Sequence, residues 1–324
     1  MRLAVWMRKI RKASRTTLPR PVFLLVFMVG SAIGLYVYMQ QSKTRIDIVT
    51  VDELYDAVDH FERDNMSVAD ILNKTIRLHC VLLTDKSTGN RSLNASKIWA
   101  SRCKSFSLYK HTKKLSYWWE AFRVTFVHHW TKADWFLFVE PATYFVPENV
   151  LLFLLPFYKS INKPVAFGSE RGGEVLPFII LSIESLEWIA SSSVACKQQK
   201  GKLLYSYCLS RIGITLIETR DQLGRHRILP YPPSDFTNRE NRAEEAWEIR
   251  KMRHPVPGGP MCCSPTAFAV MNVHYRLLES AYYFVSIVHT SGLEIDYNQT
   301  SFRQKLEQAL EKAIEGLPPT IIWQ

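Results

Sequence analysis

The segment ADWFLFVEPATYFVPEN, residues 133–149, joins an unbroken apolar run to a turn bounded by two prolines. Its first half, Trp135 to Val139, consists of aromatic and large aliphatic residues, which predicts a buried strand. Its second half contains Pro141 and Pro147, which predict a turn. In α/β proteins the end of a buried strand is the usual place for functional groups. The turn after Val139 is therefore the candidate site.

This turn contains few acidic side chains. Hard divalent cations prefer carboxylate oxygens, and a cation that also bridges a nucleotide diphosphate would favour Asp-x-Asp at such a position. The chain offers one carboxylate, Glu140, followed by Pro141 and Ala142. We interpret these three residues as a degenerate metal or nucleotide site, and we expect no catalytic residue, no bound metal and no cofactor.

Segments with strand and helix patterns alternate around this stretch. Apolar runs predict strands at residues 76–83, 105–109, 164–168 and 178–181. Helices are predicted at residues 94–102, 116–130 and 149–158, and from Ser182, which is expected to be an N-cap. An aromatic stripe in the second helix is expected to face the core: Trp119, Phe122, Phe126 and Trp130. The alternation predicts an α/β fold with a mostly parallel sheet flanked by helices.

The rest of the body gives weaker patterns. Residues 169–174 are predicted to form a loop, and its Gly172-Gly173 pair a turn. The polar residues 224–253 predict a surface excursion, and residues 301–315 a charged amphipathic helix. Residues 271–288 are apolar, but His274 and the other charged or polar residues there favour a packed element over a membrane span.

The chain begins with a basic tail followed by an apolar run. Its net charge is +11, and the first twenty residues contain basic residues but no acid, so the charge does not indicate a nucleic-acid-binding body. Residues 22–39 carry no charge and are long enough to span a bilayer. A cleaved signal peptide is the alternative, but it would need a shorter apolar core and a small-x-small exit. The positive-inside rule then predicts a single-pass type II protein with residues 1–21 cytosolic.

The remainder is predicted to be luminal, with residues 40–75 as an acidic stem and residues 76–324 as the folded domain. Apolar residues at helical spacing allow a short amphipathic helix in the stem, which would act as a spacer or, alternatively, as a contact surface: Val51, Leu54, Val58 and Phe61. N-x-Ser/Thr sequons agree with this compartment. They occur at Asn65, Asn73, Asn90, Asn94 and Asn298.

All cysteines follow the apolar run, where an oxidising lumen permits disulfides, although buried free thiols remain an alternative. They are Cys80, Cys103, Cys196, Cys208, Cys262 and Cys263. The 23-residue separation of Cys80 and Cys103 suits one disulfide, and Cys196 could pair with Cys208. The adjacent Cys262 and Cys263 could pair with each other or with distant partners, because spacing alone does not fix connectivity.

No motif for nucleotide phosphate binding or serine catalysis is present. The His/acid clusters are weak: His128-His129 lies near Asp134, and His254 stands alone between Arg253 and Pro255. A favourable position at a helix C-terminus explains the histidine pair more simply than metal binding does.

The residues from about 76 to 285 nevertheless resemble a known family, the inverting core 1 β1,3-glycosyltransferases, and within it the branch of galactosyltransferase-specific chaperones (Cosmc-like proteins). The resemblance rests on the HH-x-x-x-ADWFL run from His128 to Leu137, on Glu148-Asn149, on Leu181 to Ser185, and on Cys262-Cys263-Ser264. All six cysteines also match. The resemblance implies a GT-A-like fold behind a transmembrane helix.

The departures from the family imply a loss of catalysis. Active members carry three acids where this chain has Glu140, Pro141 and Ala142, and the first and third serve manganese and the UDP-sugar. The segment that includes the family's catalytic base is 200–207 here and contains no carboxylate. Pro177-Phe178 replaces a Gly-Gly pair, and Pro265 replaces an Asp. The metal site and the base are therefore both lacking.

The resemblance therefore implies a pseudo-glycosyltransferase that is not an enzyme. We expect a chaperone in the membrane of the endoplasmic reticulum, or alternatively of the Golgi, with the core 1 β1,3-galactosyltransferase as its client. A homo-oligomer is a further expectation, and nucleic acid is not expected as a partner. The alternatives are a diverged β1,3-galactosyltransferase that uses Glu140 and an unidentified base, and a lectin-like or structural luminal protein.

Overall fold

The computed structural model describes residues 30, 46, 48–57, 68–84, 90–110, 117–192, 204–233, 236, 251–286 and 302–317. The chain divides into two compact units, Met1–Arg45 and Ile46–Gln324, and the named helices and strands lie in the second. The predicted cytosolic tail and, except for residue 30, the predicted anchor at 22–39 lie outside the described residues. So do Asn65, Cys196 and Asn298. Within the described ranges, no helix is long and apolar enough to cross a membrane.

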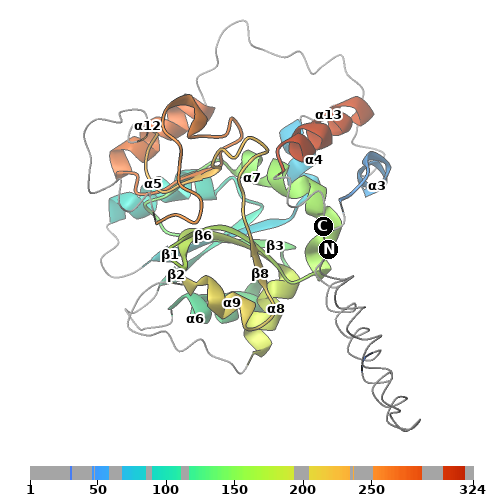
Figure 1. The fold of residues 1–324 in the computed structure, drawn as a ribbon, viewed down its shortest axis with the longest axis horizontal. Coiled ribbons are helices and arrows are strands. Elements are labelled where there is room, and N and C mark those ends of the chain that lie inside the picture. Colours follow the sequence, from blue (N-terminus) through green and yellow to red (C-terminus); the bar gives the residue numbers. More distant parts are fainter. Residues whose placement is uncertain are drawn as a thin grey trace, which may run out of the picture. The chain divides into compact units, whose positions relative to one another are not determined.

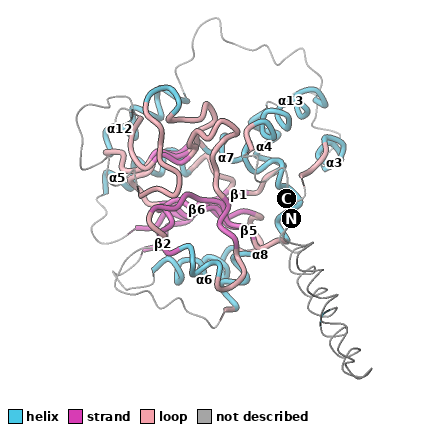
Figure 2. Tube along the Cα trace, viewed as in Figure 1, coloured by secondary structure: helices cyan, strands magenta, loops and turns pink. Residues whose placement is uncertain are grey.

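A seven-stranded mixed sheet forms the centre of the second unit (Figures 1 and 2). Its strands are β1 (Leu78–Thr84), β2 (Ser105–Lys110), β3 (Trp135–Val139), β5 (Val165–Arg171), β6 (Glu174–Ser182), β7 (Leu204–Tyr205) and β8 (Thr215–Ile217). The order is β2-β1-β3-β6-β5-β8, with β7 on β6. Only β6 runs against the common direction, because its pairings with β3, β5 and β7 are antiparallel. The predicted α/β class with a mostly parallel sheet is confirmed.

Strand β3 is fully buried because helices cover both faces of the sheet. Successive side chains of a strand point to opposite faces. Trp135, Leu137 and Val139 accordingly enter one core cluster, and Phe136 and Phe138 enter the other. The continuous apolar run in the sequence reflects this double burial.

The helices form a layer on each face of the sheet (Figure 1). One layer contains α6 (Tyr117–His129), α8 (Ile183–Ser191) and α9 (Ser206–Ser210). The other contains α4 (Val68–Thr75), α5 (Asn90–Ala100), α7 (Pro147–Leu154), the 3-10 helix η2 (Leu155–Asn162), α12 (Tyr275–Ser286) and α13 (Phe302–Glu315). The predicted N-cap is confirmed, since the Ser182 hydroxyl accepts from the backbone N–H of Ser185.

The aromatic stripe predicted for α6 is only partly buried. Trp119 and Phe122 are in the core, but Trp130 is 54% exposed. The buried face includes Trp118 and Thr125 instead, so it is rotated relative to the predicted stripe. Spacing of i, i+3, i+7 and i+11 does not separate these two faces, because α6 has aromatic residues on both.

Part of the segment predicted as a stem belongs to the folded unit. Leu54, in α3 (Val51–Ala57), is completely buried, and Ile71 and Leu72 in α4 are almost completely buried. These side chains share a cluster with Leu306 and Leu310 of α13, at the other end of the chain. Residues 46–57 and 68–75 are therefore packed against the body and do not stand apart as a spacer.

Two further segments differ from their predictions. Residues 169–174, predicted as a loop, mostly extend β5 and β6 into a hairpin whose turn is Gly172-Gly173, with φ of 59° and 84°. The predicted surface excursion at 224–253 includes a buried strand, β9 (Ile228–Leu229). That strand belongs to a small sheet with β10 (Ala269–Val270) and β4 (Tyr144–Phe145). The charged residues beside β9 led the sequence analysis to predict an exposed segment, but these residues are themselves buried.

Candidate functional site

The turn after β3 lies at the carboxyl end of the parallel strands, where open α/β sheets bind ligands. Two backbone hydrogen bonds close it. The Glu140 N–H donates to the Pro177 carbonyl on β6 at 3.4 Å, and the Thr143 N–H donates to the Glu140 carbonyl at 3.1 Å. The turn therefore has the position of an active-site loop.

The only carboxylate of the turn is engaged by a neighbouring helix. The Tyr117 hydroxyl, at the start of α6, donates to Glu140 Oε1 at 3.0 Å, and Tyr117 is almost completely buried. The carboxylate therefore has a fixed structural partner.

Pro141 and Ala142 have no side-chain atoms that could bind a cation, and their carbonyl oxygens are also engaged. The Ser96 hydroxyl of α5 donates to the Pro141 carbonyl at 2.5 Å. The Val273 N–H donates to the Ala142 carbonyl at 2.8 Å. These contacts tie the turn to two segments that are distant in the sequence.

The fold brings His274 near the turn, because the backbone N–H of its neighbour Val273 donates a hydrogen bond to the Ala142 carbonyl. Its imidazole is exposed, its Nδ1 accepts from the Arg276 N–H at 3.4 Å, and its ring lies 4.3 Å from that of Tyr275. Sequence reasoning did not select it for the site, since 132 positions separate it from Ala142.

Manganese is the cation that the family resemblance implies for this turn. The side chains present do not fit it, because Glu140 is the only carboxylate of the turn and Ala142 supplies only a methyl group. Among the described residues, no group of three His, Cys, Asp or Glu side chains could hold a metal ion.

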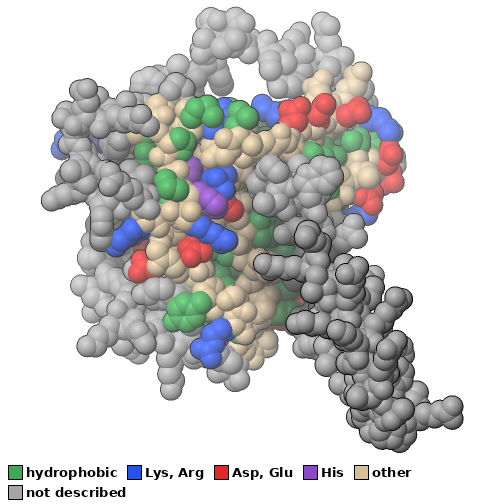
Figure 3. Space-filling model, in the orientation of Figure 1, with side chains coloured by type: hydrophobic (Ala, Val, Ile, Leu, Met, Phe, Trp, Pro, Cys, Tyr) green, Lys and Arg blue, Asp and Glu red, His purple; other side chains and the backbone are tan. Residues whose placement is uncertain are grey.

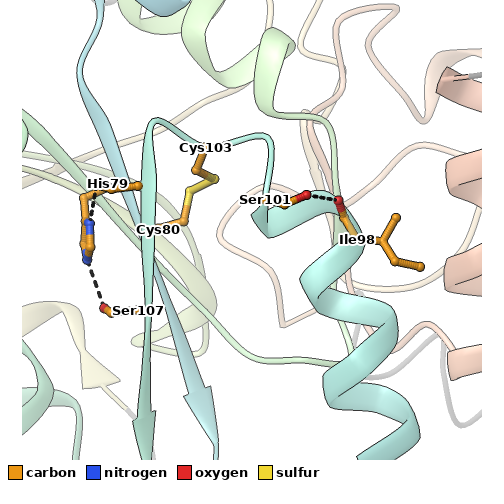
Figure 4. Close-up of a disulfide and its surroundings, with 7 residues drawn as sticks. His79, Cys80, Ile98, Ser101, Cys103 and Ser107 are labelled. Carbon is orange, nitrogen blue, oxygen red and sulfur yellow. Dashed lines mark hydrogen bonds between the residues drawn. A yellow bond between two sulfur atoms is a disulfide. The ribbon is translucent and has the colours of Figure 1, made fainter.

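In the structure, Asp134 and the predicted His128-His129 pair have different partners. Asp134 forms a two-point ion pair with Arg77, at 2.9 and 2.6 Å. The His129 ring instead stacks on that of His79, with centroids 4.5 Å apart. His79 is buried on β1, and its ring nitrogens lie 2.7 and 2.9 Å from the hydroxyls of Ser105 and Ser107 (Figure 4). Burial, reinforced by the charges of His129 and Lys132, lowers the pKa of His79 to about 3.

A second polar cluster lies at the carboxyl ends of β5 and β8. The Ser169 hydroxyl donates to Glu218 Oε1 at 3.1 Å, and His254 Nε2 lies 3.6 Å from Glu218 Oε2. Next to it, His226 is almost completely buried, and burial followed by the charge of Arg220 lowers its pKa to about 4. Figure 3 shows histidine, basic and acidic side chains gathered on the face viewed. The Ser169 hydroxyl donates to the carboxylate and not to the imidazole, so the cluster does not have the serine–histidine contact of a catalytic triad.

The described cysteines are all in disulfides. Cys80 on β1 pairs with Cys103 after α5, with Cα atoms 6.2 Å apart, as the spacing suggested (Figure 4). Cys262 and Cys263 pair with each other, which selects one of the two predicted possibilities. Cys208 is also disulfide-bonded.

The sequons that can be located lie on helices. Asn73 is in α4, half-buried, and Asn90 and Asn94 are exposed on α5. Pro265, which stands where the resembled family has an Asp, lines a groove of about 430 Å³ together with Arg225 and Lys312, and the β3 turn is not part of its lining.

No protein-family model matches the chain.

Proposed function

We propose that this protein is a catalytically inactive, Cosmc-like member of the core 1 β1,3-glycosyltransferase family that acts as a client-specific chaperone. Its client would be the core 1 β1,3-galactosyltransferase, and its site of action the membrane of the endoplasmic reticulum, with the Golgi as the alternative. One reversed strand within an otherwise parallel sheet supports the GT-A-like fold that this proposal requires.

The observation that carries the proposal is the state of the turn after β3. A transferase of this family would need carboxylate ligands at both Glu140 and Ala142, but Ala142 supplies only a methyl group, and Glu140 Oε1 accepts a hydrogen bond from Tyr117. The turn is nevertheless well ordered by hydrogen bonds to α5, β6 and Val273. This combination supports a fold that has been kept while its cation site has been lost.

A protein with the client's own fold can assist folding by covering apolar surface that a partly folded client exposes. Such surface is what makes folding intermediates of large domains aggregate. Co-expression with the core 1 galactosyltransferase, in cells that lack other folding assistance for it, should raise the amount of soluble, active transferase. An equal yield without this protein would refute the proposal.

The variant Glu140→Ala separates the chaperone from the alternative of a diverged galactosyltransferase. If the protein is a chaperone, this variant should raise the yield of active client as well as the natural chain does. If it is a transferase, the purified chain should bind UDP more tightly with Mn²⁺, and Glu140→Ala should abolish that gain. A structural or lectin-like protein without a client would show neither effect.

A further inference from the structure

The disulfide between Cys262 and Cys263 joins two neighbours in the sequence, with Cα atoms 3.7 Å apart. Such a bond restricts almost none of the unfolded chain, so it contributes little stability by that route. Its two halves differ in their surroundings. Cys262 is 4% exposed and lies in a small apolar cluster, whereas Cys263 is half-buried at the edge of that cluster. Cys263 is therefore the half of the bond that is more open to solvent.

The buried residue His226 is paired with Cys263 through the backbone. The His226 N–H donates to the Cys262 carbonyl at 3.2 Å, and the Ser264 N–H donates to the His226 carbonyl at 2.9 Å. These two hydrogen bonds make a parallel bridge in which His226 stands opposite Cys263. Residues opposite each other in a bridge point their side chains to the same face, so the imidazole and Cys263 share one face.

The imidazole of His226 is not satisfied by hydrogen bonds. His226 is 1% exposed, and neither ring nitrogen has a hydrogen-bond partner within the described ranges. The Pro255 carbonyl acts on the ring electrostatically without meeting hydrogen-bond geometry. A buried polar group without a partner costs free energy, which a suitable neighbour would recover.

Reduction of the disulfide would supply such a neighbour. A neutral imidazole has one N–H donor, and sulfur in an uncharged group is a weak acceptor. A thiolate at Cys263 would accept a charge-assisted hydrogen bond. The positive charge of Arg220, which contributes to the lowered pKa of His226, also favours a thiolate at this position.

We propose that Cys262–Cys263 is a thiol–disulfide exchange site, in which an external thiolate attacks Cys263 and the imidazole of His226 stabilises the Cys263 thiolate that the exchange produces. This inference goes beyond the proposed chaperone function and does not depend on it.

The exchange takes place in two steps. The external thiolate attacks Cys263 Sγ, the bond to Cys262 breaks, and Cys262 leaves and takes up a proton. A second external thiolate attacks the external sulfur of this mixed disulfide, and Cys263 leaves as a thiolate. Two thiols are thus oxidised to one disulfide while the cysteine pair gains two electrons. One of the two thiol protons goes to Cys262 and the other to solvent, and glutathione disulfide reverses the reaction.

Cys80–Cys103 provides an internal comparison. Cys80 has no exposed surface, Cys103 is 8% exposed, and the bond lies between β1 and the segment after α5 (Figure 4). It also closes a loop with a separation of 23 residues, so it has the stabilising role that Cys262–Cys263 lacks. We therefore expect external thiols to react first with Cys262–Cys263 in the folded protein.

A redox titration of the full-length protein in detergent micelles tests this order. The protein is equilibrated in glutathione buffers, free thiols are alkylated, and each cysteine peptide is quantified by mass spectrometry. We expect Cys262 and Cys263 to be half-reduced at a ratio of [GSH]² to [GSSG] at least about tenfold lower than Cys80 and Cys103. Reduction of both bonds at the same ratio, or of Cys80–Cys103 first, would overturn the proposal.

Two variants of His226 test the role of the imidazole. His226→Leu removes the N–H donor, so the ratio for half-reduction of Cys262–Cys263 should rise about tenfold, the loss of one hydrogen bond to a charged group. His226→Gln keeps a donor and should stay closer to the natural chain. The ratio for Cys80–Cys103 should be the same in all three proteins, which shows that the variants fold. An unchanged ratio for Cys262–Cys263 in His226→Leu would refute the proposed site.

Single-cysteine variants identify the attacked sulfur and the source of the thiol. Cys262→Ser leaves the half-buried Cys263, and Cys263→Ser leaves the buried Cys262. With glutathione disulfide, we expect the first variant to form a mixed disulfide at least about tenfold faster than the second. Equal rates would contradict the proposal.

The adduct that Cys262→Ser carries when it is isolated from cells distinguishes two sources. A glutathione adduct, recognised by its mass, identifies a small thiol as the partner. A disulfide-linked complex on a non-reducing gel identifies a protein cysteine. A free Cys263 with neither adduct would count against exchange at this site.

Discussion

The buried imidazole of His79 makes the stability of the protein depend on pH. Its pKa in the folded protein is about 3, against 6.5 in the absence of burial. Between these values the unfolded chain binds a proton that the folded protein does not bind. The free energy of unfolding should therefore fall as the pH drops through this window, by up to about 1.4 kcal/mol per pH unit from this residue.

Denaturant unfolding across this window, compared with that of His79→Gln, measures the effect. The variant should lose the part of the slope that belongs to His79, while the part from His226 remains. Parallel stability curves for the two proteins would show that the Ser105 and Ser107 hydroxyls do not hold a neutral ring.

Arg227 is a buried cation whose hydrogen bonds go mainly to carbonyl groups. It donates to the carbonyls of Thr219 at 2.8 Å and Gly316 at 2.5 Å, and to the Thr266 hydroxyl at 3.2 Å. Burial lowers its pKa to about 10. Arg227→Met should lower the free energy of unfolding by at least about 2 kcal/mol, because it leaves these acceptors without a donor.

Arg276→Met is the matched control for this prediction, since Arg276 is exposed. Thermal unfolding should show a change within about 0.5 kcal/mol for the control. Equal losses in the two variants would mean that the guanidinium of Arg227 does not join the 219, 266 and 316 segments.

Sequence reasoning reached some of these residues and not others. The shortage of carboxylates in the turn at Glu140, Pro141 and Ala142 could be read directly from the sequence, because the types of side chain present are a property of the sequence. The partners Tyr117 and Val273 could not, because no local pattern records hydrogen bonds across 23 and 131 positions. Arg227 was missed for a related reason, since a charged residue predicts exposure unless its buried acceptors are known.

Among the helices, α8 depends most visibly on one side chain. The Ser182 hydroxyl accepts from the Ser185 N–H at 3.1 Å and also donates to the Lys163 carbonyl at 2.6 Å, so it joins the helix start to the segment between η2 and β5. Ser182→Ala should destabilise the protein by about 1–2 kcal/mol. Ser191→Ala, at the exposed end of the same helix, should have little effect, and urea unfolding of both variants provides the comparison.

The elements were predictable where their periodicity was simple. Strands β1 and β3 and helix α13 follow apolar runs or a clear amphipathic pattern. Strands β5 and β6 were predicted too short, because polar residues such as Glu170 and Glu174 lie at the outer end of the hairpin, where the strand is only half-buried. Strand β9 is two residues long and depends on β10, forty positions later, so local pattern could not reveal it.

At the scale of the whole molecule, the two described disulfides should contribute unequally. Cys80–Cys103 closes a loop with a separation of 23 residues, whereas Cys262–Cys263 joins neighbours and closes almost none. The chain-entropy model gives about 3 kcal/mol for the first and far less for the second. Chemical unfolding of Cys80→Ala/Cys103→Ala and Cys262→Ala/Cys263→Ala should show this difference, and equal losses would contradict it.

The boundary of the folded unit also belongs to this scale. Acidic composition indicated that residues 40–75 form a stem, yet Leu54, Ile71 and Leu72 are buried. Composition reports the exposed face of such short helices, while their apolar face needs a partner from elsewhere in the chain. That partner is α13, which no local reading of residues 40–75 could supply.

The packing of α3 and α4 against α13 has a consequence during synthesis. Arg303 forms an ion pair with Asp52, and Leu306 and Leu310 share a core cluster with Leu54, Ile71 and Leu72. At a ribosomal rate of about 5–20 residues per second, α13 follows α4 by roughly 10 to 45 s. Throughout that interval the apolar side chains of α3 and α4 that pack on α13 lack this partner in the nascent chain. A protein proposed to shield another during folding therefore needs shielding itself until α13 has been translated.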